Sequence, residues 1–172
     1  GNGWMGPAAK ADISDLMDFL RSEYGAQRFV FASGSMGGTS NLIYASQRPD
    51  NVSGIVALGA ASDLAVFHRW CRERNHGVIS EIADAIESAY GGTPEQNPSA
   101  YKAHSVITNA NQLTMPVFIS HGSIDELIPV SEMRRLCGCL ADKKDLVYTE
   151  IPGGNHDSPL ALMPPALDWV MD

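Results

Sequence analysis

Four short apolar runs, separated by stretches with helical spacing, constrain this chain more than any other feature of its sequence. The runs are RFVFA (28–32), GIVAL (54–58), PVFIS (116–120) and LVYTEI (146–151). The first three are the kind of continuous apolar run that is typical of strands buried on both faces. Helices are expected within 7–25, 37–47, 131–140 and 164–171. This alternation predicts an α/β fold with a parallel sheet flanked by helices on both faces.

The connection between the second and third runs is too long for a single crossover helix, because residues 59–115 separate the two. Asp63 can cap a helix that continues to Asn75. An apolar stripe between Ile79 and Ile86 predicts a second helix. Residues 93–96 (TPEQ) resemble a capping box that opens a third. We therefore predict a helical cap inserted at about 63–111 and packed above the sheet.

Residues 31–45 (FASGSMGGTSNLIYA) crowd small side chains around one serine, between a predicted strand and a predicted helix. This context favours a nucleophile elbow, the strained G-x-S-x-G turn that exposes a catalytic serine. Ser35 is the predicted nucleophile, and Gly37 is small enough to let the turn close. Ser33 replaces the first glycine of the pattern. The N–H of Met36 is the predicted oxyanion donor, because the start of a helix favours negative charge.

A serine hydroxyl needs a neighbouring base, and that base needs an orienting carboxylate. His156, in the loop IPGGNHDSP after the fourth run, is the predicted base. Asp125, in the loop after the third run, is the predicted acid, and Glu126 is the alternative. Asp157 lies too close to His156 in sequence to orient it. All three predicted members, Ser35, Asp125 and His156, follow strands of a parallel sheet, so they should meet at its carboxyl edge.

The other four histidines have less specific positions. His121 ends the third run and is expected to shape the turn that follows it. His68, His76 and His104 fall within the predicted cap, where we expect them at the surface.

The segments SGSMGG, PVFISHGSIDELIPV and IPGGNHDSP resemble the α/β-hydrolase superfamily. AYGGTPEQNPSAYKAHSVI is similar to a segment of its branch of prolyl-oligopeptidase-like peptidases and dienelactone-hydrolase-like esterases. The likeness covers nearly all of the chain from Arg28 onward. It implies a catalytic triad of Ser35, Asp125 and His156, in the chain order of this fold. It leaves the substrate open, because the fold hosts many different hydrolyses.

Composition excludes several other functions. The net charge of −8 and the pI of about 5.0 argue against a nucleic-acid partner. The basic cluster of Arg69, Arg72 and Arg74 is expected to be a solvated helix face. No apolar stretch is long enough for a membrane span. The glycine pattern lacks the lysine of a phosphate-binding loop and the spacing of a dinucleotide fingerprint, and no metal or other cofactor is predicted.

Three cysteines are present, and Cys137 and Cys139 stand too close together to bridge each other easily. Free thiols fit a reducing compartment, which favours a cytoplasmic location. Secretion stays open, because the N-terminus looks incomplete.

These features predict one domain over residues 1–172, a metal-free serine hydrolase that cleaves a small carboxylic ester through an acyl-enzyme. The alternatives are a peptidase or acyl-aminoacyl hydrolase with the same triad, and a non-catalytic binding module on this scaffold. An oxyanion hole in this fold takes its second donor from a loop after an earlier strand. One helix and one strand precede Ser35, so we expect missing N-terminal strands, or a partner such as a second copy, to complete the sheet.

Overall fold

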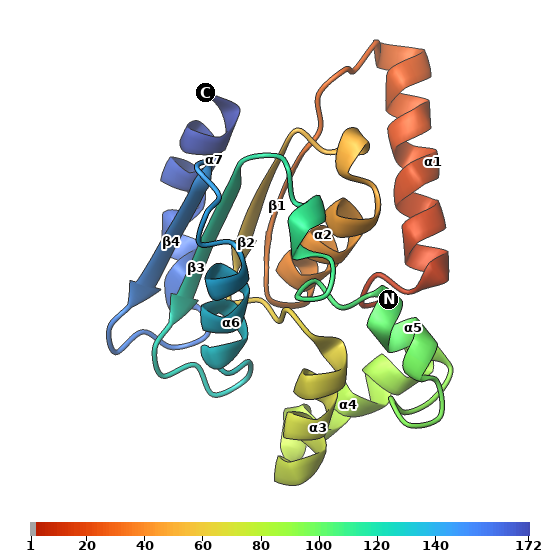
Figure 1. The fold of residues 1–172 in the computed structure, drawn as a ribbon, viewed down its shortest axis with the longest axis vertical. Helices are drawn as coiled ribbons and strands as arrows, with labels where there is room; N and C mark the ends of the chain where they lie inside the picture. The colour runs from red at the N-terminus through yellow and green to blue at the C-terminus, as the bar shows by residue number, and fades with distance from the viewer. Residues whose placement is uncertain (1–2) are drawn as a thin grey trace.

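The four predicted strands form one parallel sheet. A computed structural model, which describes residues 3–172, contains β1 (Val30–Gly34), β2 (Gly54–Leu58), β3 (Val117–Gly122) and β4 (Leu146–Ile151). The strands are hydrogen-bonded in the order β1-β2-β3-β4, and each pair is parallel. Their carboxyl ends therefore lie at one edge of the sheet, at the bottom of Figure 1. The predicted α/β fold with a parallel sheet is confirmed.

Helices cover both faces of this sheet (Figure 1). Helices α2 (Ser35–Gln47) and α6 (Ser131–Cys139) pack on one face. Helix α1 (Pro7–Tyr24) lies against α2. Helix α7 (Met163–Met171) packs on the other face. Successive strand residues point to opposite faces, so Ile119 joins the core beneath α2 and α6, whereas Phe118 joins the core beneath α7. Three 3-10 helices lie in the connections: η1 (Pro49–Asn51), η2 (Ala110–Gln112) and η3 (Ser158–Leu162).

The burial of β1 differs from the sequence-based expectation. Every residue of β2 and β3 is buried, as predicted for continuous apolar runs. Every residue of β1 is only half-buried, although its run is as apolar as those of β2 and β3. Every residue of β4 is also half-buried. The reason is strand order. Within the described residues β1 and β4 are the two edges of the sheet, so each has a hydrogen-bonded neighbour on one side only.

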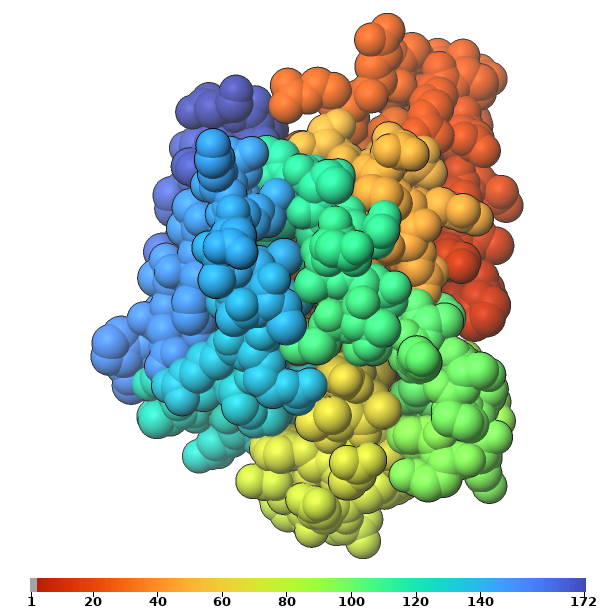
Figure 2. Space-filling view, in the orientation of Figure 1, coloured from red at the N-terminus to blue at the C-terminus, as the bar shows by residue number. Residues whose placement is uncertain are grey.

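Three helices occupy residues 64–103, beyond the carboxyl ends of the strands: α3 (Leu64–Arg74), α4 (Gly77–Tyr90) and α5 (Pro98–Ala103). In the space-filling view they form the lower lobe, coloured from yellow to green (Figure 2). The expected capping box forms its two hydrogen bonds, between Thr93 and Gln96, but it closes a separate turn. Helix α5 begins later, at Pro98, because proline lacks an N–H and suits a first helical turn.

A buried carboxylate fixes the start of this lobe. Glu132 of α6 is 1% exposed, and its Oε2 accepts hydrogen bonds from the backbone N–H groups of Ser62 and Asp63, at 3.0 and 2.9 Å. The Ser62 hydroxyl donates to the same oxygen at 3.1 Å. Asp63 in turn caps α3 by accepting from the backbone N–H groups of Ala65 and Val66. The path from β2 into α3 is thus held by one side chain from the helix that follows the neighbouring strand β3.

Replacing Glu132 by Ala should lower the free energy of unfolding by about 2–4 kcal/mol, because it leaves the backbone N–H groups of Ser62 and Asp63 without their acceptor. Chemical denaturation monitored by circular dichroism measures this loss. Glu73→Ala is the matched control, since Glu73 is exposed on α3 and its loss should change stability by less than about 0.5 kcal/mol. A loss below about 1 kcal/mol for Glu132→Ala would show that the contacts are not needed.

Candidate active site

Ser35 lies at the junction of β1 and α2 in a left-handed backbone conformation. Its φ is +55°, a value that side chains with a Cβ rarely adopt. A Cβ on Gly37 would stand 2.7 Å from the Oγ of Ser33, which is too close for any other residue. Ser33 fits in place of the usual glycine because its Oγ turns back to accept a hydrogen bond from the Asn41 side chain at 2.8 Å. The turn therefore has the strained, crowded geometry that the sequence predicted.

The three predicted site residues form one chain of hydrogen bonds. The Nε2 atom of His156 is 2.9 Å from the Oγ of Ser35, and its Nδ1 is 2.8 Å from Oδ2 of Asp125. A carboxylate oxygen can only accept, so Nδ1 carries the proton and Nε2 presents a lone pair to the serine hydroxyl. The Asp125 side chain is fully buried, whereas that of His156 is 17% exposed. The arrangement can move a proton from Ser35 to His156.

Asp125 is held by three hydrogen bonds. Its Oδ1 accepts from the backbone N–H groups of Leu127 and Ile128, both at 2.9 Å. Its Oδ2 faces His156 and also lies 3.1 Å from Nε2 of His121. Burial by itself would raise the pKa of Asp125, but these hydrogen bonds outweigh burial and hold the pKa well below its usual range. The carboxylate therefore stays ionised beside His156.

The same carboxylate changes the basicity of His156. The hydrogen bond that His156 donates to Asp125 raises the pKa of His156 above its ordinary value of 6.5, and partial burial opposes this rise without cancelling it. A neutral imidazole is required for proton uptake, so the site gains its base only as the pH rises through this elevated pKa.

The loop that carries His156 crosses the end of β3 with no room to spare. A Cβ on Gly122 would collide with the backbone carbonyls of Gly154 and Asn155. Beyond this crossing, the N–H of Ile124 donates to the carbonyl of Gly154 at 3.0 Å. The side chain of Asn155 accepts from the backbone N–H of Asp157 and so fixes the turn. Within the loop, Gly154 is packed too closely against Ile151 for a side chain, whereas Gly153 has a left-handed φ of +68°.

Met36 follows Ser35 in the first turn of α2. The first four N–H groups of a helix lack intrahelical acceptors, so the Met36 N–H belongs to the set that can receive a developing negative charge. Two pockets open onto Ser35. The first, of about 220 Å³, faces the lower lobe formed by α3, α4 and α5. It is lined by Trp4, Met36, Val78, Glu81, Ile82 and Ala85. The second, of about 210 Å³, is lined by Gly34, Leu58, His156, Asp157 and Leu160.

The alternatives for the acid take other positions. Glu126 is exposed and lines a separate pocket of about 600 Å³ between its loop and the cap. Asp157 is exposed beside His156 and contributes to raising the pKa of that histidine, but the hydrogen-bonded carboxylate is Asp125.

Two histidines of the cap are buried, contrary to expectation. His68 is 5% exposed because its Nε2 pairs with Glu87 at 2.6 Å. His104 is 8% exposed and contacts the carbonyl of Ala100 through Nδ1. His76 is exposed, as expected.

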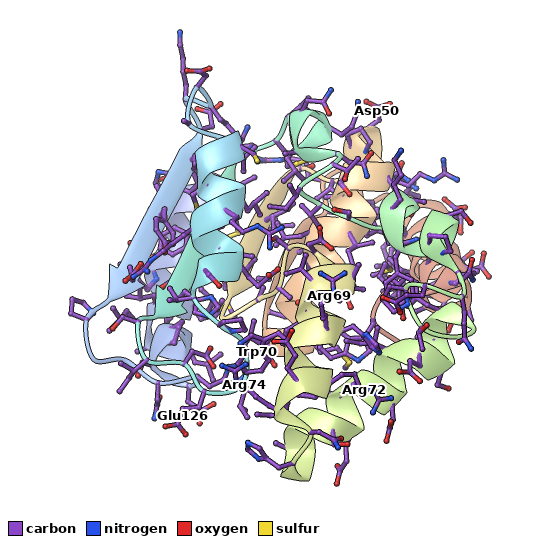
Figure 3. The ribbon with its side chains drawn as sticks, turned by 60° about the horizontal axis from the view of Figure 1, so that its bottom comes forward. Asp50, Arg69, Trp70, Arg72, Arg74 and Glu126 are labelled. Carbon is purple, nitrogen blue, oxygen red and sulfur yellow. The ribbon has the colours of Figure 1, made fainter. Side chains whose placement is uncertain are left out.

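The three arginines of α3 do not act together. Figure 3 shows Trp70 and Arg74 on the side of α3 toward Glu126, and Arg72 on the side toward α4. The Arg74 guanidinium lies 3.9 Å from the centre of the Trp70 ring. Arg72 pairs with Asp84 and Glu87 of α4. Arg69 is exposed.

Cys71 and Cys137 are poor nucleophiles. Burial raises the pKa of Cys71 and of Cys137 to about 12, so both stay protonated near neutral pH. All three cysteines are free within the described chain. Across residues 3–172, no group of three or more His, Cys, Asp and Glu side chains is placed to hold a metal ion, and no helix there is long and apolar enough to span a membrane.

Several solved structures share this fold. A puromycin-hydrolyzing peptidase of Mycobacterium tuberculosis matches with a TM-score of 0.69 at 25% identity, over 90% of this chain and 22% of its own. A protein of Bacteroides ovatus described as a dipeptidyl aminopeptidase IV matches with a TM-score of 0.70 at 18% identity, over 94% and 22%. A thermostable esterase matches with a TM-score of 0.63 at 15% identity, over 94% and 35%.

The chain thus spans between about a fifth and about a third of the length of these structures. No family model matches the sequence. The shared architecture confirms the resemblance to the α/β-hydrolase superfamily, and the chain has the α/β-hydrolase fold.

Replacing Asp125 by Asn should lower the pKa of His156 by about one unit or more, because the charge that raises it is removed. Titration of the His156 ring by NMR measures this pKa without reference to any activity. Asp142→Asn, at an exposed position in the connection that leads into the amino end of β4, is the control and should leave the pKa unchanged. An unaltered His156 pKa in Asp125→Asn would mean that the two side chains are not coupled in solution.

Proposed function

We propose that this chain carries the catalytic centre of a serine hydrolase, which cleaves carboxylic esters through an acyl-enzyme. The observation that carries the proposal is the hydrogen-bonded chain from Asp125 through His156 to Ser35, with a half-buried Ser35 on a left-handed turn. A serine at such a turn, next to a base with an orienting carboxylate, is the arrangement that activates a hydroxyl for attack on a carbonyl. Peptidases and an esterase with the same fold support a hydrolytic reaction.

The first half of the reaction transfers the acyl group. His156 Nε2 takes the proton of Ser35 as the serine oxygen bonds to the ester carbonyl carbon, and Asp125 stabilises the imidazolium. The carbonyl oxygen becomes an oxyanion near the Met36 N–H and the positive end of α2. The tetrahedral intermediate then expels the alkoxide, which takes the proton from His156 and leaves as the alcohol.

The second half releases the acid. His156 removes a proton from water, and the hydroxide attacks the acyl carbon. When this intermediate collapses, the Ser35 oxygen leaves and recovers its proton from His156. An ester has an acyl part and an alcohol part, and the pockets on either side of Ser35 offer a place for each. Their volumes of about 220 and 210 Å³ suit small groups.

A second candidate is the hydrolysis of a peptide or an acyl-aminoacyl bond by the same residues. It is favoured by the fold neighbours, which include an acylaminoacyl peptidase of Pyrococcus horikoshii. An amine leaves less readily than an alkoxide, so the two candidates predict different rates on a matched ester and amide. Measuring kcat/KM for one acyl group as its p-nitrophenyl ester and as its p-nitroanilide separates them.

Ser35→Ala should reduce ester hydrolysis at least about 1000-fold without unfolding the protein, because it deletes the nucleophile and little else. The same variant should lose labelling by a fluorophosphonate probe, which tests for an activated serine and distinguishes an enzyme from a binding module. Ser33→Ala is the matched control and should keep more than about a tenth of the activity, since Ser33 is turned toward Asn41. Activity that survives in Ser35→Ala would reject Ser35 as the nucleophile.

Each pocket at Ser35 has one carboxylate and no lysine or arginine among its lining residues, namely Glu81 on the cap side and Asp157 on the other. A cationic ester should therefore be hydrolysed faster than an anionic ester of equal size. Glu81→Gln should reduce this preference about two- to fivefold, as expected for an exposed charge. Paired kcat/KM values for an aminoacyl and a dicarboxylic half-ester test this. An anionic preference in the unaltered protein would contradict it.

A further inference from the structure

His121 is a buried imidazole next to the proposed triad, and the reaction described above gives it no part. Its side chain is fully buried at the end of β3. Its Nε2 lies 2.8 Å from the carbonyl oxygen of Ile128 and 3.1 Å from Oδ2 of Asp125. The same Oδ2 lies 2.8 Å from Nδ1 of His156. One carboxylate oxygen is therefore placed between two imidazole rings.

The position of the proton on His121 follows from its partners. A carbonyl oxygen can only accept a hydrogen bond, so the Nε2 that faces Ile128 carries the hydrogen. The Nδ1 atom is buried and has no hydrogen-bond partner among the described residues. A second proton on Nδ1 would create a buried donor with nothing to receive it, which is costly. The His121 N–H is accordingly on Nε2 and points to the Ile128 carbonyl, and Oδ2 of Asp125 lies 3.1 Å from the same nitrogen.

We infer that His121 is a positioning residue of the site: its Nε2–H donates a second hydrogen bond to the Asp125 oxygen that holds His156, so that two histidines share this oxygen. The consequence of this inference for catalysis rests on the proposed function. The distances among His121, Asp125 and His156 do not. Sharing weakens the hold of Asp125 on His156, because each donor withdraws part of the negative charge on Oδ2.

The remaining surroundings leave Asp125 as the group through which His121 acts. Glu150 stands opposite His121 in the register of β3 and β4, and its carboxylate is engaged by Arg134 of α6 and by the Tyr148 hydroxyl. Asp125 does not need His121 to keep its orientation, because its Oδ1 accepts hydrogen bonds from two backbone N–H groups. Removing the His121 donor should therefore leave Asp125 in place and return its full charge to His156.

The test compares His121→Leu, which lacks a donor, with His121→Gln, whose side-chain N–H can replace Nε2–H. The readout is the pKa of His156 by NMR titration of the whole chain. We expect a rise of at least about half a unit in His121→Leu and a change below about 0.2 units in His121→Gln. In esterase assays the acid limb of the pH profile of kcat/KM should move to higher pH together with this pKa. KM measured at a pH well above this pKa should be unchanged. Equal shifts in both variants, or none in a folded His121→Leu, would overturn the inference.

A measurement on the unaltered protein keeps the inference falsifiable if His121→Leu does not fold. Nitrogen-15 NMR of the neutral His121 ring should show the proton on Nε2 and not on Nδ1. A proton on Nδ1 would overturn the assignment. Absence of esterase activity with the expected NMR results would reject the proposed function and leave the shared carboxylate standing.

Discussion

The candidate site depends on the crossing of two loops at the end of β3, where Gly122 leaves no room for a side chain. Three backbone N–H groups join the loops: Ser123 donates to Ile151, Ile124 donates to Gly154, and Gly153 donates to the Ser123 hydroxyl. Asp125 and His156 lie just beyond this seam. Their separation is therefore set by main-chain packing, which is stiffer than the side chains that it positions.

Much of this architecture can be predicted from sequence because its signals are local. A strand buried by neighbours on both sides, such as β2 or β3, leaves a continuous apolar run, and a tight turn after β1 requires small residues around Ser35. The carboxyl ends of parallel strands meet at one edge, so three loops that are distant in the chain could be expected to converge. The sequence could predict which residues meet at this edge. The distances between their atoms could be obtained only from the structure.

The features that the sequence did not predict depend on distant partners. Half-burial of β1 follows from its place in the strand order, which its own residues do not encode. His68 is buried because Glu87 pairs with it from the next helix, and Glu132 is buried because it accepts hydrogen bonds from N–H groups about 70 residues earlier in the chain. No local pattern marks a polar side chain that will be satisfied by contacts elsewhere in the chain. An amphipathic pattern predicts that the polar side chains of a helix point to solvent. Glu132 of α6 points inward instead.

The left-handed backbone at Ser35 means that stability and the proposed chemistry favour different residues at the same position. An L-amino acid with a side chain costs about 1–2 kcal/mol more than glycine in this conformation. For folding alone, glycine would be the better residue at the start of α2, and serine is retained there at a loss. Mutational drift toward greater stability would therefore erase the hydroxyl first. A stabilising glycine at this one position would be a sign of disuse in related chains.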